Sequence, residues 1–159
     1  MDTLDSKLQI LLVDDDDTFY ELIVALVEMN ESIANRIVVN RLRDGRDALD
    51  YLHGVEPFDD RTQHPRPDLV LMDQRMPRLD GTDALRQIRN DVRIRATPVC
   101  MFSSSDQDGL VREAYELGAN FYLVKPMELE QLLSKLHKIV DFFSTVAALP
   151  SDGEMAFEH

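Results

Sequence analysis

The sequence predicts an α/β protein in which five parallel strands form one sheet with helices on both faces. The first observation is that short apolar runs alternate with amphipathic stretches along the chain, in five repeats of strand then helix. The second is that several runs are apolar at every position, which is typical of parallel strands buried on both sides. Because crossovers between parallel strands are right-handed, this alternation favours a doubly wound sheet.

The predicted strands follow the apolar runs in chain order. The run that ends at Met72 is short and unbroken, as expected for a strand in the middle of the sheet. The next run begins at Pro98, whose missing N–H is tolerated at the start of a strand. We predict strands at 8–13, 36–40, 69–72, 97–102 and 120–124.

Each strand is followed by a stretch with apolar residues three and four apart, the pattern of an amphipathic helix. Asp16 and Asp17 suit the start of the first helix, because the helix dipole favours acidic residues there. Gly118 is expected to end the fourth, since glycine readily adopts the left-handed conformation of a helix cap. We predict helices at 17–30, 45–53, 82–91, 107–118 and 128–147, which completes a flavodoxin-like (βα)5 fold.

The chain is expected to hold one domain at 8–147, with an N-terminal extension at 1–7 and a flexible C-terminal tail at 148–159. The tail is predicted from its turn-forming and polar residues after Leu149. Between the second helix and third strand, residues 54–67 form a long, polar, proline-containing loop. Loops of this length are usually functional or mobile.

Composition limits the partners. A chain of 159 residues that is 44% hydrophobic can bury the core of one globular domain. Its formal net charge of -13 argues against nucleic acid or an anionic membrane as a partner, since phosphate binding needs a clustered basic surface. The single cysteine, Cys100, excludes an internal disulfide. No stretch reaches the roughly 20 apolar residues of a membrane span, and the start lacks a signal peptide's basic residues, so we expect a cytoplasmic protein.

Polar side chains directly follow four of the predicted strands. Asp14 and Asp15 come after the first strand, Asp73 after the third and Lys125 after the fifth, while Ser103 follows the fourth apolar run. Ligand chemistry in open α/β sheets takes place at these carboxyl ends of the strands. The sequence therefore predicts one site that combines acids, a base and a hydroxyl.

Phosphoryl transfer is the chemistry that fits this set. Carboxylates held together raise each other's pKa unless a divalent cation neutralises them. Mg²⁺ suits an oxygen-only set of ligands, and no histidine or cysteine lies beside the acids to suggest zinc or iron. A carboxylate nucleophile, a positioned metal and a lysine together indicate transfer of a phosphoryl group to an aspartate.

The motifs around these residues resemble the receiver domain of two-component response regulators, over about residues 8–147. The resemblance rests on Leu12-Val13-Asp14-Asp15, Leu71-Met72-Asp73 with Met76-Pro77 and Asp80-Gly81, Ser103, and Tyr122-Leu123-Val124-Lys125-Pro126.

The resemblance implies that Asp73 accepts a phosphoryl group from a sensor histidine kinase. Mg²⁺ would be held by Asp14, Asp15, Asp73 and the backbone carbonyl of Arg75, with Asp15 as the direct ligand of the acidic pair. Lys125 would form an ion pair with the phosphoryl group, and the proline that follows it is often cis in the family.

The resemblance also implies a switch rather than an enzyme, because the protein assists only its own phosphorylation and dephosphorylation. Ser103 would turn toward the phosphoryl group and free space for Tyr122 to turn inward. The output surface would be helix 107–118, strand 120–124 and helix 128–147. The long 54–67 loop is similar to that of small regulators paired with bacterial phytochrome kinases, which makes light signalling an expected pathway.

Two alternatives stay open at this point. The run Asp14-Asp15-Asp16-Asp17-Thr18 also fits the D-x-D-x-T pattern of haloacid-dehalogenase-like phosphohydrolases, with Asp14 as nucleophile and Asp16 as acid and base. That alternative leaves Asp73 and its Met-Pro turn unexplained. The other is a receiver-like scaffold that binds partners without phosphorylation, which the complete set of site residues disfavours.

The last predicted helix suggests a homodimer. Its apolar stripe should pack on the sheet: Leu129, Leu132, Leu133, Leu136, Ile139, Val140 and Phe143. Phe142 and Val146, together with Leu149, lie off that stripe and form an apolar ridge on the output surface. We expect self-association or docking on the kinase there, unless the helix end folds back and buries these residues.

Overall fold

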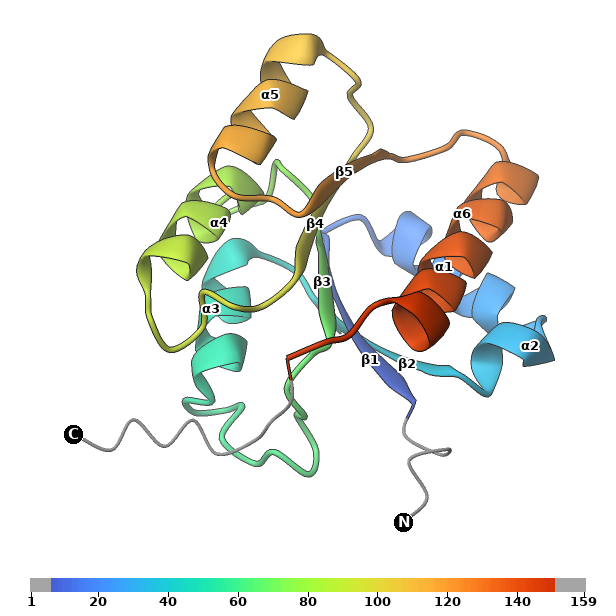
Figure 1. Cartoon of the computed structure of the whole chain (residues 1–159), viewed down its shortest axis with the longest axis horizontal. Coiled ribbons are helices and arrows are strands. Elements are labelled where there is room, and N and C mark those ends of the chain that lie inside the picture. The colour runs from blue at the N-terminus through green and yellow to red at the C-terminus, as the bar shows by residue number, and fades with distance from the viewer. Residues whose placement is uncertain (1–6, 151–159) are drawn as a thin grey trace.

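The computed structural model describes residues 7–150, which form a sheet of five parallel strands (Figure 1). The strand order is β2-β1-β3-β4-β5. The chain forms β1 next to one edge of the sheet, adds β2 at that edge, and then adds β3, β4 and β5 in turn toward the opposite edge. This order confirms the predicted doubly wound fold. Most of the predicted extension and most of the predicted tail lie outside the described residues. The strands are β1 (Leu8–Val13), β2 (Ile37–Leu42), β3 (Leu69–Met72), β4 (Val99–Ser103) and β5 (Phe121–Val124).

Helices cover both faces of the sheet. In Figure 1, α1, α2 and α6 lie on one face, and α3, α4 and α5 lie on the other. The helices are α1 (Asp17–Glu28), α2 (Glu31–Ala34), α3 (Gly45–His53), α4 (Gly81–Asn90), α5 (Asp108–Glu116), α6 (Leu129–Asp141) and the π-helix η1 (Phe142–Val146).

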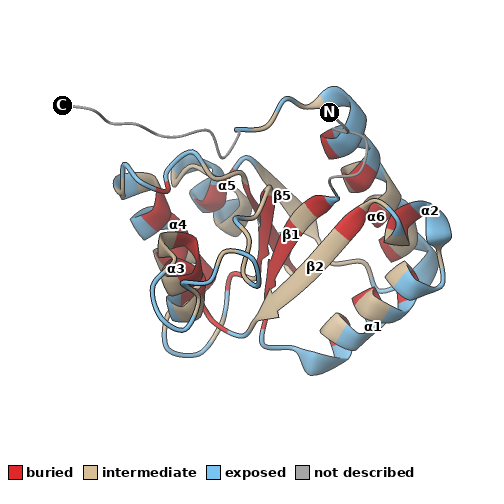
Figure 2. Cartoon of the chain, turned by 90° about the horizontal axis from the view of Figure 1, so that it is seen from below, coloured by how far each residue is buried: buried red, intermediate tan, exposed pale blue. Residues whose placement is uncertain are grey.

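The central strands are almost entirely buried (Figure 2), and they supply two apolar layers. Ile10 and Leu12 belong to the layer that also holds α1 and α6 side chains, whereas Leu11 and Val13 belong to the layer against α3 and α4. Successive side chains of a strand point to opposite faces. An unbroken apolar run such as β1 therefore contributes to both layers at once.

Hydrogen bonding continues past the carboxyl ends of the strands and brings the loops there into register. The Asp14 N–H donates to the Leu42 carbonyl at 2.9 Å, and the Asp73 N–H donates to the Val13 carbonyl at 2.9 Å. The Lys125 N–H donates to the Ser103 carbonyl at 2.7 Å. The predicted site residues are thus fixed to one edge of the sheet by the backbone.

The structure adds one helix to those predicted and shortens another. A short helix, α2, follows α1 and was not expected, because its four residues are too few to show a helical period. The helix predicted at 128–147 ends at Asp141, and the chain continues as η1, where the Ala147 N–H donates to the Phe142 carbonyl at 2.8 Å.

Leu129 and Leu149 also differ from their predicted positions. Leu129, which was placed on the buried stripe, is 50% exposed because it begins α6 at the edge of the sheet. Leu149 was placed on the exposed ridge, yet it packs against the core as the chain turns back after η1. Phe142 and Val146 remain at the surface, 43% and 71% exposed.

Arg61 and Tyr51 attach the 54–67 loop to α3. Arg61 donates to the carbonyls of Tyr51 at 2.8 Å and Leu52 at 3.0 Å, in the last turn of α3. The Tyr51 hydroxyl donates to the Pro65 carbonyl at 2.9 Å, and the rings of Phe58 and His64 pack edgewise nearby. The loop therefore packs on the α3 end of the domain.

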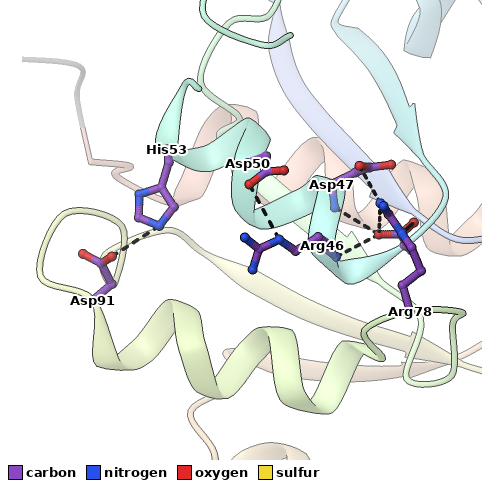
Figure 3. A network of polar contacts seen from close by, with 7 residues as sticks. Arg46, Asp47, Asp50, His53, Arg78 and Asp91 are labelled. Atoms are coloured by element: carbon purple, nitrogen blue, oxygen red, sulfur yellow. Dashed lines mark hydrogen bonds and ion pairs between the residues drawn. The ribbon is translucent and has the colours of Figure 1, made fainter. Parts of the chain in front are cut away.

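Ion pairs join α3 to the segments on either side of α4 (Figure 3). Arg78 contacts Asp44 at 2.8 Å and Asp47 at 2.7 Å, next to the start of α3. At the other end of α3, His53 lies 3.3 Å from Asp91. Within residues 7–150, no helix is long and apolar enough to cross a membrane.

Candidate functional site

Three carboxylates meet at the carboxyl edge of the sheet. Asp14 and Asp15 follow β1, and Asp73 follows β3, which is hydrogen-bonded to β1. One oxygen from each carboxylate lies within 4.8 Å of the others. Asp14 is only 1% exposed, Asp73 is half-buried and Asp15 faces solvent. The structure thus brings these three predicted site residues together at one edge of the sheet.

Lys125 reaches this cluster from the end of β5. Its ammonium group donates to the Asp14 carboxylate and lies 3.4 Å from Asp73. It also lies 4.4 Å from the centre of the Phe19 ring, where a cation is attracted to the aromatic face. The lysine is therefore held between the two acids by contacts on more than one side.

The surroundings of Asp73 favour its neutral form. Burial raises the pKa of this carboxyl, and the positive charge of Lys125 lowers it. The negative charge of Asp14 raises the pKa again, and the net direction is upward. An ionised Asp73 therefore gains from any further positive charge at this edge.

The donor set fits a hard divalent cation. Three carboxylates face one lysine, so ionisation of all three leaves a net negative charge to be balanced. The cluster offers oxygen atoms only, which are the ligands that Mg²⁺ prefers. The Arg75 carbonyl, the fourth ligand implied by the resemblance, belongs to the loop that directly follows Asp73.

The loop that carries Asp14 and Asp15 is fixed by its own acids. The Asp16 N–H donates to Asp14 Oδ1 at 2.9 Å, and the Asp16 side chain accepts from the Phe19 N–H at 3.0 Å as the N-cap of α1. Asp17 lies in the first turn of α1. Asp16 and Asp17 therefore begin the helix, as predicted.

Arg41 is a residue that the sequence analysis missed. Its Nε donates to the Asp14 carbonyl at 2.9 Å, one of its terminal nitrogens contacts Asp17 at 2.7 Å, and its guanidinium lies 4.9 Å from the centre of the Tyr20 ring. Hydrogen bonding from Arg41 lowers the pKa of Asp17. The arginine is on β2, far from these residues in sequence, so only the register of the sheet shows the contact.

Gly81 brings the start of α4 against the phosphoacceptor candidate. A Cβ at this position would lie 1.9 Å from the Asp73 carbonyl oxygen, so a larger residue cannot be accommodated without movement. The Gly81 N–H donates to the Gln74 carbonyl at 2.8 Å and closes the loop. The Asp-Gly pair of the sequence motif thus has two functions, since Asp80 caps α4 by accepting from the Asp83 N–H at 3.1 Å.

Ser103 and Tyr122 are placed differently from each other relative to the acids. The Ser103 hydroxyl accepts from the Ser105 N–H at 3.3 Å, and none of its hydrogen bonds among the described residues reaches Asp73. The Tyr122 hydroxyl donates toward the Ser105 carbonyl at 2.6 Å and lies 3.0 Å from Gln74 Oε1. Tyr122 is therefore already turned inward beneath the loop after β4, whereas the resemblance implied a turn that follows movement of Ser103.

The Lys125–Pro126 peptide bond, which the resemblance suggested could be cis, is trans. Within residues 7–150 the cis peptide bond is Glu56–Pro57, in the long loop.

The fold and the acidic site together define a phosphoacceptor switch of the α/β class. Residues 10–137 match the response regulator receiver domain, and the chain belongs to this family. This assignment separates it from the haloacid-dehalogenase-like alternative, in which Asp73 had no explanation.

The comparisons also identify similar individual proteins. The chain is 36% identical over 134 residues to the probable methanogenesis regulatory protein FilR2 of Methanothrix harundinacea, covering 84% of this chain and 82% of that protein. It is similar to the phosphorylated cyanobacterial phytochrome response regulator RcpA, with 29% identity, a TM-score of 0.81, and coverage of 92% of this chain and 100% of that chain. The Mn²⁺-bound response regulator Rcp1 aligns with 28% identity and a TM-score of 0.77, over 90% of this chain and 99% of that chain.

Proposed function

We propose that Asp73 is the phosphoacceptor of this response regulator and that a sensor histidine kinase supplies the phosphoryl group. The observation that carries the proposal is the position of Asp73, half-buried among Asp14, Asp15 and Lys125 at the carboxyl edge of the sheet. Asp14 shares the cluster and the lysine, but its side chain is only 1% exposed, whereas that of Asp73 is 17% exposed and so more accessible to a phosphoryl donor.

The proposed reaction is an in-line displacement. An oxygen of ionised Asp73 forms a bond to phosphorus as the bond from phosphorus to the donor's imidazole nitrogen breaks, and the imidazole leaves with that electron pair and takes up a proton. Lys125, already 3.4 Å from Asp73, balances negative charge on the transferred oxygens. The buried Asp14 holds Lys125 at this position through its carboxylate.

We propose Mg²⁺ as the cofactor, held by Asp14, Asp15, Asp73 and the Arg75 carbonyl. Its charge would favour the ionised, nucleophilic form of Asp73 and neutralise the phosphoryl oxygens. The Mn²⁺-bound form of Rcp1 supports a divalent cation in a protein of this fold.

We propose that the signal leaves through α5, β5 and α6. Ser103 would bind a phosphoryl oxygen, and because the Ser105 N–H donates to its hydroxyl, the loop before α5 would move with it. The similarity to RcpA, a phytochrome response regulator, supports a phytochrome kinase as partner and light as input. A cytoplasmic location follows from such a partner, and the acidic charge supports an absence of nucleic acid from its partners.

We further propose that the protein forms a homodimer through the last helical segment. Phe142 and Val146 remain exposed on η1, which directly continues α6 of the proposed output surface. Phe142 packs edgewise on the buried Phe143 with ring centres 5.2 Å apart, so it is presented in a fixed position.

Incubation with acetyl phosphate and Mg²⁺, followed by intact-mass measurement, tests the proposed function. The native protein should gain one phosphoryl group, and Asp73→Asn should gain none. Asp59→Asn, in the exposed part of the 54–67 loop, is the matched control and should be modified like the native protein. Uptake by Asp73→Asn equal to that of the control would contradict the proposal.

A further inference from the structure

Gln74, which directly follows Asp73, has a buried side chain. It is 5% exposed, and the residues on both sides of it are more accessible. The buried polar or charged residues of the described chain are Asp14, Asp44, Gln74 and Ser103. Of the other three, Asp14 pairs with Lys125, Asp44 pairs with Arg78, and Ser103 ends β4. Because burying an amide is costly unless it is hydrogen-bonded, the contacts of Gln74 indicate what it does.

Those contacts connect three separate elements. Gln74 itself extends from the end of β3, its Oε1 lies 3.0 Å from the Tyr122 hydroxyl on β5, and its Nε2 lies 3.4 Å from the Leu110 carbonyl in α5. β5 and α5 are two of the three elements of the proposed output surface. One side chain thus joins the phosphoacceptor loop directly to that surface.

The Tyr122 hydroxyl has a second acceptor, the Ser105 carbonyl at 2.6 Å. A hydroxyl has one proton, so it donates to one of the two acceptors at a time. The two acceptors differ in what they are attached to. Ser105 belongs to the loop after β4, and its N–H donates to the Ser103 hydroxyl. Gln74 instead follows β3, and its backbone carbonyl accepts from the Gly81 N–H at the start of α4.

We propose that Gln74 is a positioning residue that holds Tyr122 inward whether or not Asp73 is phosphorylated. Both contacts of the Tyr122 hydroxyl are made by groups of the chain alone, so this orientation needs no phosphoryl group. If Ser103 moves toward a phosphoryl group and takes Ser105 with it, Gln74 still accepts the hydroxyl proton. The tyrosine stays in place, and the change on the output surface comes from the loop before α5.

This inference rests on the proposed function for its meaning in signalling, but its structural content can be measured separately. The chain is labelled with 3-fluorotyrosine, and the Tyr122 signal in the ¹⁹F NMR spectrum is assigned by its loss in Tyr122→Phe. Spectra are recorded without ligand and then with Mg²⁺ and beryllofluoride, an analogue of the phosphoryl group.

The native Tyr122 signal should be that of a buried ring without ligand and should stay buried with beryllofluoride. Gln74→Met has a side chain of similar length but no polar group, and should shift the inward-to-outward ratio toward exposure by about three- to tenfold, as expected for one hydrogen bond. Gln87→Met makes the same chemical change at an exposed position of α4 and should leave the signal unchanged. The inference would be overturned if Gln74→Met gave the same Tyr122 signal as the native protein. It would also be overturned if Tyr122 of the native protein became buried only with beryllofluoride.

A reciprocal measurement covers the case in which Gln74→Met does not fold. Tyr122→Phe removes only the hydroxyl, and it should shift the side-chain amide signals of Gln74 in a ¹⁵N spectrum; unchanged signals would overturn the inference. Intact-mass measurement after acetyl phosphate, on the native protein, reports on the proposed function independently. A protein that takes up no phosphoryl group but shows an inward, Gln74-dependent Tyr122 would contradict the proposed function and leave the positioning role supported.

Discussion

At the scale of single residues, Asp44 shows how a buried acid can stabilise this fold. It accepts hydrogen bonds from the Arg46 and Asp47 N–H groups as the N-cap of α3, and it pairs with Arg78. Burial alone would raise the pKa of Asp44, but the bonds from Arg78 and from these N–H groups outweigh it and the pKa is lowered. Arg78 makes this contact from a left-handed backbone conformation, with φ of 62°, which few residues other than glycine adopt.

Replacing Arg78 by glutamine should lower the free energy of unfolding at neutral pH, because the buried Asp44 carboxylate loses its charged partner. A carboxyl with a lowered pKa contributes stability that is present above its unfolded-state pKa and is lost as the pH falls through the folded-state value. The deficit of Arg78→Gln should therefore shrink as the pH falls below about 4, the ordinary range of an aspartate. Urea unfolding of the native protein and of Arg78→Gln, from neutral pH to below about pH 4, measures this difference in the free energy of unfolding.

Arg86→Gln is the control for that experiment. Arg86 pairs with Asp83 at 2.7 Å, but both side chains are about half exposed, and exposed pairs contribute little. Its stability should follow the native protein at every pH. A deficit in Arg78→Gln that stays constant down to strongly acidic pH would show that the arginine acts through something other than Asp44.

Asp15 provides the test of the metal site, because it is exposed and can be changed without leaving a cavity. Mg²⁺ should raise the melting temperature of the native protein by relieving repulsion among the three carboxylates. Asp15→Asn should weaken this response. Asp16→Asn keeps the α1 cap, since asparagine and aspartate cap equally well, and should respond as the native protein does. A full Mg²⁺ response in Asp15→Asn would rule out the proposed ligand set.

At the scale of elements, the position of α4 depends on the absence of a side chain at its first residue. Gly81→Ala places a methyl group against the Asp73 carbonyl, so either the helix or the β3 end must shift. We expect a loss of about 1–3 kcal/mol, as for other overpacked sites, and slower phosphorylation by acetyl phosphate. Gly109→Ala in α5 meets no atom within 4 Å and should not lower stability, because alanine favours helix more than glycine. Equal stability of the two variants would contradict this account of the α4 position.

The elements also show what periodicity can predict. The five long helices could be predicted because each has enough residues to reveal its period, and the five strands because each follows a short apolar run. The four-residue α2 does not, and the change to η1 at Phe142 leaves the apolar pattern almost unaltered. Arg61 lies outside every predicted element, so nothing in its sequence context indicated that it holds the 54–67 loop on α3.

At the scale of the whole molecule, the sequence located the site because strand ends in a parallel sheet share one edge. Asp14, Asp73 and Lys125 could be predicted together for that reason. Gln74 and Arg41 could not, because their contacts depend on which side chains face each other across the folded chain. The inward orientation of Tyr122 was missed for the same reason, since it depends on Gln74.

Association of whole molecules is tested through the residues that the fold leaves exposed. Light scattering after size-exclusion chromatography should give a dimer for the native protein and a monomer for Phe142→Asp. Val92→Asp, which changes an apolar residue that is 56% exposed elsewhere on the surface, should remain dimeric. A monomeric native protein, or a dimer that Phe142→Asp leaves intact, would exclude this interface.

The location of the phosphoryl group tests the central claim most directly. After reaction with acetyl phosphate and Mg²⁺, borohydride reduces an aspartyl phosphate to homoserine, which peptide mass spectrometry then locates. We predict homoserine at position 73, in the peptide that joins β3 to α4. Homoserine at position 14 instead would contradict the account and restore the phosphohydrolase alternative.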